Sequence, residues 1–386
     1  MKLKFTLLVT GACLMALVSI AQAQNDFIAG ADLSLLPYFE TNGIVYKDHG
    51  RPGDAIMILK NHGINCVRLR LFTSTPRQAR NDPYDYINNL AYTVPLAVRV
   101  KEAGLRLMID FHYSDTWADP GHQATPAEWK MLAFPQLIER LRDYNSNCIA
   151  AFSSAGAMPD YVQVGNEITG GMLWPLGRLS GSDPENQWAR FTQLMKSAIQ
   201  GIKDAAGSQM PKIVVHIDRG GDWNTTKWFF DNLNRHDVPY DIIGESYYPF
   251  YHGPPANLIA CITNTVQRYG RPVIIAETDL PRIYSTNIFN LPASTDGQVQ
   301  FVSMLGRVMK SAPNNLGAGI FWWGAEYEWP NANEAGVGTR SMFDENGNVL
   351  PVADTLGQLA TPVNARIGQT SPLQGFNDSR HHPFGP

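Results

Sequence analysis

The feature that most restricts the fold of this 386-residue chain is a regular alternation of short apolar segments with longer helical ones. Most of the short segments are nearly continuous apolar runs, which is typical of parallel strands covered on both faces by helices. Eight such strands are predicted, over residues 27–32, 65–72, 105–112, 161–166, 213–217, 240–247, 272–277 and 317–323.

Helical periodicity separates these strands and predicts helices over 54–62, 93–103, 127–144, 185–206, 225–234, 256–269 and 298–311. Gly63, Gly104 and Gly270 each stand just before the next strand, as expected for glycines that end a helix in the left-handed conformation. No G-x-G-x-x-G follows the first strand, so an open dinucleotide-binding sheet is disfavoured. The predicted fold class is α/β, a single (β/α)8 TIM barrel.

The N-terminus resembles a secretory signal. Lys2 and Lys4 precede an apolar run over 5–20, and Ala-Gln-Ala at 21–23 supplies a small-residue cleavage pattern. We therefore expect a signal peptide at 1–23, a catalytic barrel at 24–364 and a loosely ordered tail at 365–386.

The expected destination is periplasmic or extracellular, with no stable membrane span, because the apolar run is short. A cell-surface lipoprotein attached at Cys13 is less favoured, since too little hydrophobic sequence precedes that residue. Cys66, Cys148 and Cys261 remain in the mature chain, so at most one disulfide bridge can form, and Cys66 is expected to be a buried thiol.

Charge and composition restrict the partners. The net charge is only -4 and there is no polybasic run, so neither nucleic acid nor an anionic membrane is an expected partner. The 9 Trp and 15 Tyr residues, many in apparent loops, suit a groove in which sugar rings stack on aromatic faces. A polysaccharide substrate and a monomeric chain are the expectation.

Two glutamates end two of the predicted strands. Glu167 follows the fourth strand and Glu277 ends the seventh, and in a barrel these strands face each other with their C-terminal ends at the active-site mouth. A single glutamate there would more often be structural. Two at matching strand ends instead indicate glycoside hydrolysis, which needs one carboxyl group on each side of the scissile bond.

Other polar residues gather at the same end. Arg68 and Arg70 lie on one face of the second strand, where they could keep a carboxylate ionised or form a salt bridge in the barrel floor. His112, Asp115 and Trp117 follow the third strand in a stretch suited to binding hydroxyl groups and stacking a sugar ring. Strands five, six and eight end near three further candidates, His216, Tyr247 and Trp323.

Several of these motifs resemble glycoside hydrolase family 53, the endo-β-1,4-galactanases. The resemblance covers nearly all of the mature chain and is strongest in DFHYSDTWADPGHQ at 110–123 and QVGNEITGGMLWPLG at 163–177, with VRLRL at 67–71 and SYYPFYHG at 246–253. It implies a barrel of the retaining glycosidase clan A, no organic cofactor, and hydrolysis of galactan in arabinogalactan. Calcium as a structural ion stays open, although no oxygen-ligand cluster stands out, and no metal-binding residue is assigned.

The resemblance also implies roles for the site residues. Glu167 would be the acid/base and Glu277 the nucleophile, at the retaining separation of ~5 Å. Asn166 would bind the sugar 2-hydroxyl, and Arg70 and Tyr247 would keep Glu277 ionised and oriented. His112, His216, Trp117 and Trp323 would line the groove with Asp115 beside them, while the loops after Glu277 and Trp323 depart from the family pattern.

Three other functions stay open at this point. A related barrel glycanase could act on mannan, cellulose or xylan, but the motif after strand three argues against it. A non-catalytic polysaccharide-binding protein would be favoured by loss of either glutamate, and both are present. A metal-dependent hydrolase would need H-x-H or H-E-x-x-H spacing, which the sequence lacks.

Overall fold

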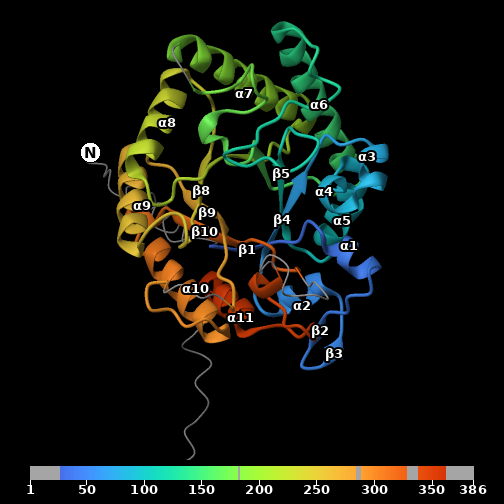
Figure 1. Cartoon of the computed structure of the whole chain (residues 1–386), viewed down its shortest axis with the longest axis vertical. Helices are drawn as coiled ribbons and strands as arrows, with labels where there is room; N and C mark the ends of the chain where they lie inside the picture. The colour runs from blue at the N-terminus through green and yellow to red at the C-terminus, as the bar shows by residue number, and fades with distance from the viewer. Residues whose placement is uncertain (1–26, 181–182, 284–287, 328–337, 362–386) are drawn as a thin grey trace, which may run out of the picture.

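A computed structural model describes residues 27–180, 183–283, 288–327 and 338–361. Its central element is a closed barrel of eight parallel strands in the order β1-β10-β9-β8-β7-β6-β5-β4, with helices on the outside (Figure 1). The barrel strands are β1 (Ile28–Asp32), β4 (Cys66–Leu71), β5 (Arg106–Phe111), β6 (Tyr161–Val164), β7 (Lys212–Ile217), β8 (Ile242–Ser246), β9 (Val273–Thr278) and β10 (Gly317–Trp322). The predicted (β/α)8 barrel and all eight of its strands are confirmed, with ends that differ by a few residues.

Eight helices in the described part of the chain cover the barrel, and all but the last follow the prediction. They are α2 (Ala55–Asn61), α5 (Leu90–Glu102), α6 (Phe134–Ser154), α7 (Pro184–Ala206), α8 (Trp223–Arg235), α9 (Pro255–Tyr269), α10 (Thr295–Lys310) and α11 (Pro351–Ala360). Shorter elements were not predicted: α1 (Leu36–Thr41), α3 (Pro76–Asn81), α4 (Pro83–Tyr86) and a small hairpin of β2 (Lys47–Asp48) and β3 (Arg51–Pro52). Helix α11 was not predicted either.

Helix α6 begins later than expected, and proline explains the shift. Pro135 lies in the first turn of α6, where its missing N–H leaves no helical hydrogen bond unmade. A helix running from residue 127 would have placed the same proline in its interior. The helix therefore begins at Phe134 and continues to Ser154.

The barrel interior has two layers. Near the N-terminal ends of the strands, buried apolar side chains fill the floor; they are Ile28, Cys66, Met108, Val214, Ile242, Ile274, Ala276 and Phe321. One inward position further along several strands, the residues become polar and remain buried: Arg68 on β4, Asp110 on β5, Gln163 on β6 and His216 on β7. The floor supports this polar layer, which in turn supports the C-terminal mouth.

The predicted signal peptide at 1–23 and the predicted tail at 365–386 lie outside the described residues. Among the described helices, none combines the length and the apolar character that a membrane span requires. Cys66, Cys148 and Cys261 are all buried, and for Cys66 this confirms the expected core thiol.

Candidate active site

A cavity of about 320 Å³ opens at the C-terminal ends of the strands. Both glutamates that were singled out from the sequence lie in its wall. The lining residues are Arg70, His112, Trp117, Ala118, Asp119, Asn166, Glu167, Tyr248, Tyr251, Glu277, Trp323 and Arg340. They come from loops and strand ends that are far apart in the sequence, and the barrel brings them together.

Glu277 reaches the cavity through an irregularity in β9. Along β9 the inward side chains include Ile274 and Ala276, so strict alternation would turn Glu277 outward. The pairing with β8 and with β10 shifts register after Ile275, which places one extra residue in β9. A bulge of this kind changes the direction in which the following side chain points, and the side chain that follows here, Glu277, lies in the cavity wall.

Two donors hold the Glu277 carboxylate. The Arg68 guanidinium lies 2.7 Å from Oε1, and the Tyr248 hydroxyl donates to Oε2 over 3.0 Å. Burial raises the pKa of Glu277, and the charge of Arg68 opposes that rise. The carboxyl group is only 7% exposed, so the cation acts with little screening by water.

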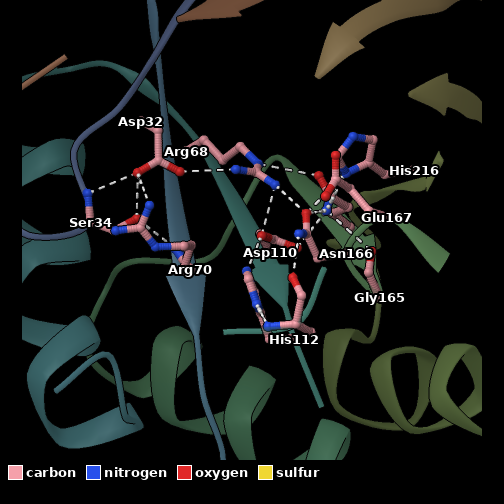
Figure 2. Close-up of polar contacts among 12 residues, drawn as sticks. Asp32, Ser34, Arg68, Arg70, Asp110, His112, Gly165, Asn166, Glu167 and His216 are labelled. Atoms are coloured by element: carbon pink, nitrogen blue, oxygen red, sulfur yellow. Dashed lines mark hydrogen bonds and ion pairs between the residues drawn. The ribbon is translucent and has the colours of Figure 1, made fainter. Parts of the chain in front are cut away.

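Arg68 also joins two other acidic residues beneath the cavity (Figure 2). Its guanidinium lies 2.9 Å from Asp32 and 2.8 Å from Asp110, and all three side chains are buried. Arg70 contacts Asp32 at 3.3 Å. Burying charges is unfavourable unless they are paired, so this cluster fixes the position of Arg68 only while every member is present.

Glu167 stands at the opposite wall on a strained backbone. It follows β6 through Gly165 and Asn166, and its own φ of 50° and ψ of 48° lie in the left-handed region, which a residue with a Cβ seldom adopts. The Ser246 hydroxyl, at the end of β8, donates to Glu167 Oε1 over 2.6 Å. The side chain is nearly buried, at 9% exposure.

The two glutamates differ in their affinity for a proton. Burial raises the pKa of Glu167 well above its usual range, and the nearby charge of Glu277 raises it further. The pKa of Glu277 rises less because Arg68 stabilises its ionised form. A proton shared between them therefore resides on Glu167, which separates the pair into an acid and a carboxylate.

The buried polar layer holds Asn166 at the cavity wall. Its Oδ1 accepts from Arg68 over 2.9 Å and its Nδ2 donates to the Ala118 carbonyl over 2.8 Å. Since Arg68 can only donate, these contacts determine which end of the amide is oxygen. One hydrogen of Nδ2 stays available for a bound group at the cavity wall.

Aromatic rings form another part of the wall. Trp117 and Trp323 lie with their ring centroids 6.2 Å apart, and the Arg70 guanidinium is 4.3 Å from the Trp117 centroid. Tyr251 is 76% exposed at the rim. Such surfaces suit the C–H faces of a sugar ring, which stack on aromatic side chains.

His112 presents one defined tautomer to the cavity. Its Nδ1 accepts from the backbone N–H of Ala118 over 2.9 Å, so the ring proton lies on Nε2, 2.9 Å from Asp110. The ring is thereby held from two sides.

The expected contacts of Arg70 and Tyr247 differ from those observed. Arg68, one inward position deeper than Arg70, is the arginine that contacts Glu277, whereas Arg70 contacts Asp32 and the Tyr327 hydroxyl. Tyr247 is buried and donates to the Gly253 carbonyl, and Tyr248 contacts Glu277 instead. Along β8 the side chains of Ile242 and Ser246 point inward, so strand alternation places Tyr248, and not Tyr247, on the inward face.

Two further candidates lie behind the cavity wall. His216 is fully buried, with Nδ1 3.0 Å from Asn166 Oδ1 and Nε2 2.8 Å from the Ser246 hydroxyl. Asp115 accepts hydrogen bonds from Thr73, Gln78 and Ala127, which tie three loop segments together. His112, Trp117, Asn166 and Trp323 do line the cavity, as does Arg70.

Sequence reasoning missed Tyr248, Ser246 and Arg340 as parts of the site. Arg340 lines the cavity and pairs with buried Asp279 at 3.2 Å. Ser246 and Tyr248 are the neighbours of Tyr247 in the sequence, so the predicted strand end was correct to within one residue. Asp279, the partner of Arg340, lies in the loop after Glu277 that departs from the family pattern. In the described part of the chain, no group of three or more His, Cys, Asp or Glu side chains is arranged to hold a metal ion.

Comparisons with known proteins agree with this geometry. The family model described as glycosyl hydrolase family 53 matches residues 28–356. An arabinogalactan endo-beta-1,4-galactanase of Humicola insolens is 36% identical over 337 residues, which cover 83% of this chain and 96% of that protein. A probable arabinogalactan endo-beta-1,4-galactanase A of Neosartorya fischeri is 37% identical, over 79% of this chain and 85% of its own length.

Solved structures give the same result. The family 53 catalytic domain of Ignisphaera aggregans has a TM-score of 0.79 at 32% identity, and the match covers 87% of this chain and 97% of that domain. A fungal beta-1,4-galactanase has a TM-score of 0.76 at 33% identity, over 85% and 98% of the two chains. A xylanase of Thermotoga maritima, at 14% identity and a TM-score of 0.53 over 82% and 91%, shares the barrel fold alone.

Proposed function

The chain belongs to glycosyl hydrolase family 53, and from that premise we propose that it is a retaining endo-β-1,4-galactanase acting on galactan in arabinogalactan. The observation that carries the proposal is one cavity with two glutamates in unlike surroundings. Glu277 has a cation and a hydroxyl donor on its carboxylate, while Glu167 is buried with a strongly raised pKa. The named galactanases among its relatives support the substrate.

In the first step Glu277 attacks the anomeric carbon and Glu167 protonates the departing glycosidic oxygen. The products are a glycosyl-enzyme ester on Glu277 and a free galactan end. In the second step Glu167, now ionised, removes a proton from water as the water attacks the anomeric carbon. The ester bond breaks, Glu277 is released as a carboxylate and the configuration is retained. We expect the two carboxyl groups to lie about 5 Å apart.

The remaining wall residues position the sugar. The spare N–H of Asn166 donates to the sugar 2-hydroxyl, a contact that strengthens as positive charge develops on the ring. Trp117 and Trp323 provide stacking surfaces, and Arg70 keeps Trp117 in place through their 4.3 Å contact. This chemistry needs no organic cofactor. The enzyme acts as an exported monomer after removal of residues 1–23.

The reaction is tested by measuring reducing ends released from β-1,4-galactan, β-mannan, xylan and carboxymethylcellulose. We expect cleavage of galactan alone. Glu167→Gln should reduce the rate on the order of 10²- to 10⁴-fold, the usual contribution of a general acid, and Glu277→Gln should reduce it at least as much. Release of the β-anomer, followed by proton NMR, would establish retention.

Glu245→Gln is the matched control. Glu245 is also a buried glutamate with a raised pKa, but it lies on β8 and bonds to Thr226 and to the backbone N–H of Arg219. It should keep nearly full activity per folded molecule. Cleavage of mannan or cellulose instead of galactan would replace the substrate, and an active Glu277→Gln would overturn the mechanism.

A further inference from the structure

Behind Glu167, Ser246 and His216 form a buried row of polar groups that the mechanism above does not use. The Ser246 hydroxyl is 2.6 Å from Glu167 Oε1, and His216 Nε2 is 2.8 Å from the same hydroxyl. Both residues are fully buried. Polar groups buried this deeply must take one another as hydrogen-bond partners. The direction of each hydrogen bond therefore constrains the direction of the next.

Gln163 supplies the far end of the row. Its Oε1 accepts from Arg68 Nε over 3.2 Å, and because a guanidinium cannot accept, the amide must turn its NH₂ group the other way. That group lies 2.5 Å from Asp110 Oδ1 and 3.1 Å from each of the Gly165 carbonyl, Asn166 Oδ1 and His216 Nδ1, and its two hydrogens must be divided among these acceptors. If Gln163 donates to Nδ1, the single proton of a neutral imidazole is on Nε2 and points at Ser246.

Neutral His216 is the form that its surroundings favour. Burial lowers the pKa of His216 well below its usual range, and so do Arg68, His112 and His252, while Asp110 opposes them. A neutral ring has only two arrangements. Either Nε2–H donates to Ser246, or Nδ1–H donates to Asn166 Oδ1 over 3.0 Å and Ser246 donates back to Nε2. In the second arrangement Glu167 must carry its proton on Oε1 and donate it in a hydrogen bond to the Ser246 hydroxyl.

On the basis of the proposed function, we propose that Ser246 and His216 are positioning residues. They form a directional chain, Gln163 to His216 to Ser246 to Glu167, that keeps Oε1 of Glu167 an acceptor so that the catalytic proton is carried on Oε2. After that proton leaves for the glycosidic oxygen, the same Ser246 hydroxyl stabilises the carboxylate that must act as base. One hydroxyl thus serves both steps without reorienting.

The first test is a double-mutant cycle with Glu167→Ala. Ser246→Ala should lower kcat on galactan about 10- to 100-fold, the effect of removing a hydrogen bond to a charged group. With one activated substrate in both backgrounds, where kcat depends on Glu167 acting as base, the same change in the Glu167→Ala background should alter kcat by less than about twofold. The substrate for this comparison is 2,4-dinitrophenyl β-galactobioside, whose leaving group needs no acid. A merely structural role would lower both backgrounds alike.

Ser246→Thr keeps the hydroxyl and should restore most of the activity. The matched control is Ser197→Ala on α7, since Ser197 is another buried serine whose hydroxyl donates to a backbone carbonyl, that of Ile138, outside the barrel. It should leave kcat unchanged. Equal losses in the wild-type and Glu167→Ala backgrounds would overturn the proposal.

The pH profile adds a readout that altered packing would not move. Without the Ser246 donor the ionised form of Glu167 is less stable, so the basic limb of kcat/KM should shift to higher pH. Glu277, Asp218 and Arg68 also face Glu167 and remain unchanged in the variant. An unmoved basic limb would contradict the proposal.

The tautomer can be read without any substrate. Two-dimensional NMR of protein labelled with ¹⁵N-histidine should show His216 protonated at Nε2, with its signals assigned by their absence in His216→Asn. Protonation at Nδ1 would overturn the chain. If the wild type fails to cleave galactan while the Nε2–H tautomer is present, the proposed function fails and the hydrogen-bond chain stands.

Discussion

Arg68 is the residue at which the acidic side chains of the barrel interior converge. Its buried guanidinium is the partner of Asp32, Asp110 and Glu277. Arg68→Ala would leave these carboxylates without their common counter-ion. Breaking buried pairs in this way typically destabilises a fold by about 3–5 kcal/mol, and we expect that loss together with at least a 100-fold drop in activity. Chemical denaturation and a galactan assay measure the two effects.

Arg142→Ala is the comparison for Arg68. Arg142 pairs with Asp204 at 2.6 Å on the surface, where water and side-chain entropy offset the attraction. The variant should match the wild type in stability and activity. Equal stability losses in the two variants would show that the buried cluster does not act as described.

Tyr248→Phe tests the second donor on Glu277. The tyrosine hydroxyl donates to the carboxylate and stabilises its ionised form, so its removal should raise the pKa of Glu277 further. The acidic limb of kcat/KM should therefore move to higher pH. Tyr247→Phe loses only a bond to the Gly253 carbonyl and should leave the limb in place.

The sequence predicted the kinds of residue in the site better than their individual contacts. Glu167 and Glu277 were found because strand ends are visible in a pattern of apolar runs. Arg68 and Arg70 share a face, so alternation cannot tell which of them reaches Glu277; depth in the barrel decides. The extra residue in β9 that accompanies Glu277 leaves no mark in the sequence pattern, whereas alternation from Ser246 along β8 favours Tyr248 over Tyr247.

At the scale of elements, the strands were predictable because each is buried on both faces, which makes most of them nearly continuous apolar runs. Helix α11 was not predicted, although it packs against β1 and α10. Its sequence, PVADTLGQLA, contains a glycine, which is a poor helix former in a helix interior. The helix is therefore stabilised by its packing against β1 and α10 and not by the helix propensity of its residues.

That glycine gives a prediction about α11. A Cβ on Gly357 would lie 2.0 Å from the His62 carbonyl oxygen and 2.6 Å from the Gly63 Cα, so backbone would have to move. Gly357→Ala should destabilise the protein by about 1–3 kcal/mol, as overpacking does, despite the better helix propensity of alanine. Thermal unfolding measures the change.

Gly306→Ala is the matched helical control. Its Cβ would meet Leu359 at 2.5 Å, but the atoms in contact are the far end of a flexible side chain. The gain of about 1 kcal/mol in helix propensity should offset the repacking, and stability should change little. A Gly357→Ala variant as stable as Gly306→Ala would contradict the close approach of α11 to the end of α2.

For the whole molecule, Glu326 links stability to pH. Burial raises its pKa to about 8, the charge of Asp32 adds to that shift and Arg70 opposes it. Between the unfolded pKa of about 4.3 and about 8, the folded state binds a proton that the unfolded state has lost. Stability should therefore fall as pH rises through this window, by up to about 1.4 kcal/mol per pH unit from this group.

Glu326→Gln removes the titration and keeps an oxygen for the backbone N–H of Leu35, which donates to Glu326 over 2.8 Å. Its denaturation midpoint should change less between pH 5 and pH 8 than that of the wild type. Parallel pH profiles for the two proteins would show that Glu326 is ionised in the fold.

The left-handed backbone at Glu167 implies that greater thermal stability and catalytic activity are in conflict at this position. Such a conformation costs roughly 1–2 kcal/mol for a residue with a Cβ, and the carboxyl group is buried as well. Glu167→Gly would relieve the backbone strain and remove the acid/base carboxyl group, giving a more stable but inactive protein. Selection for heat resistance without a check on activity would therefore favour loss of this glutamate, so engineering should hold position 167 constant and seek stability in the outer helices.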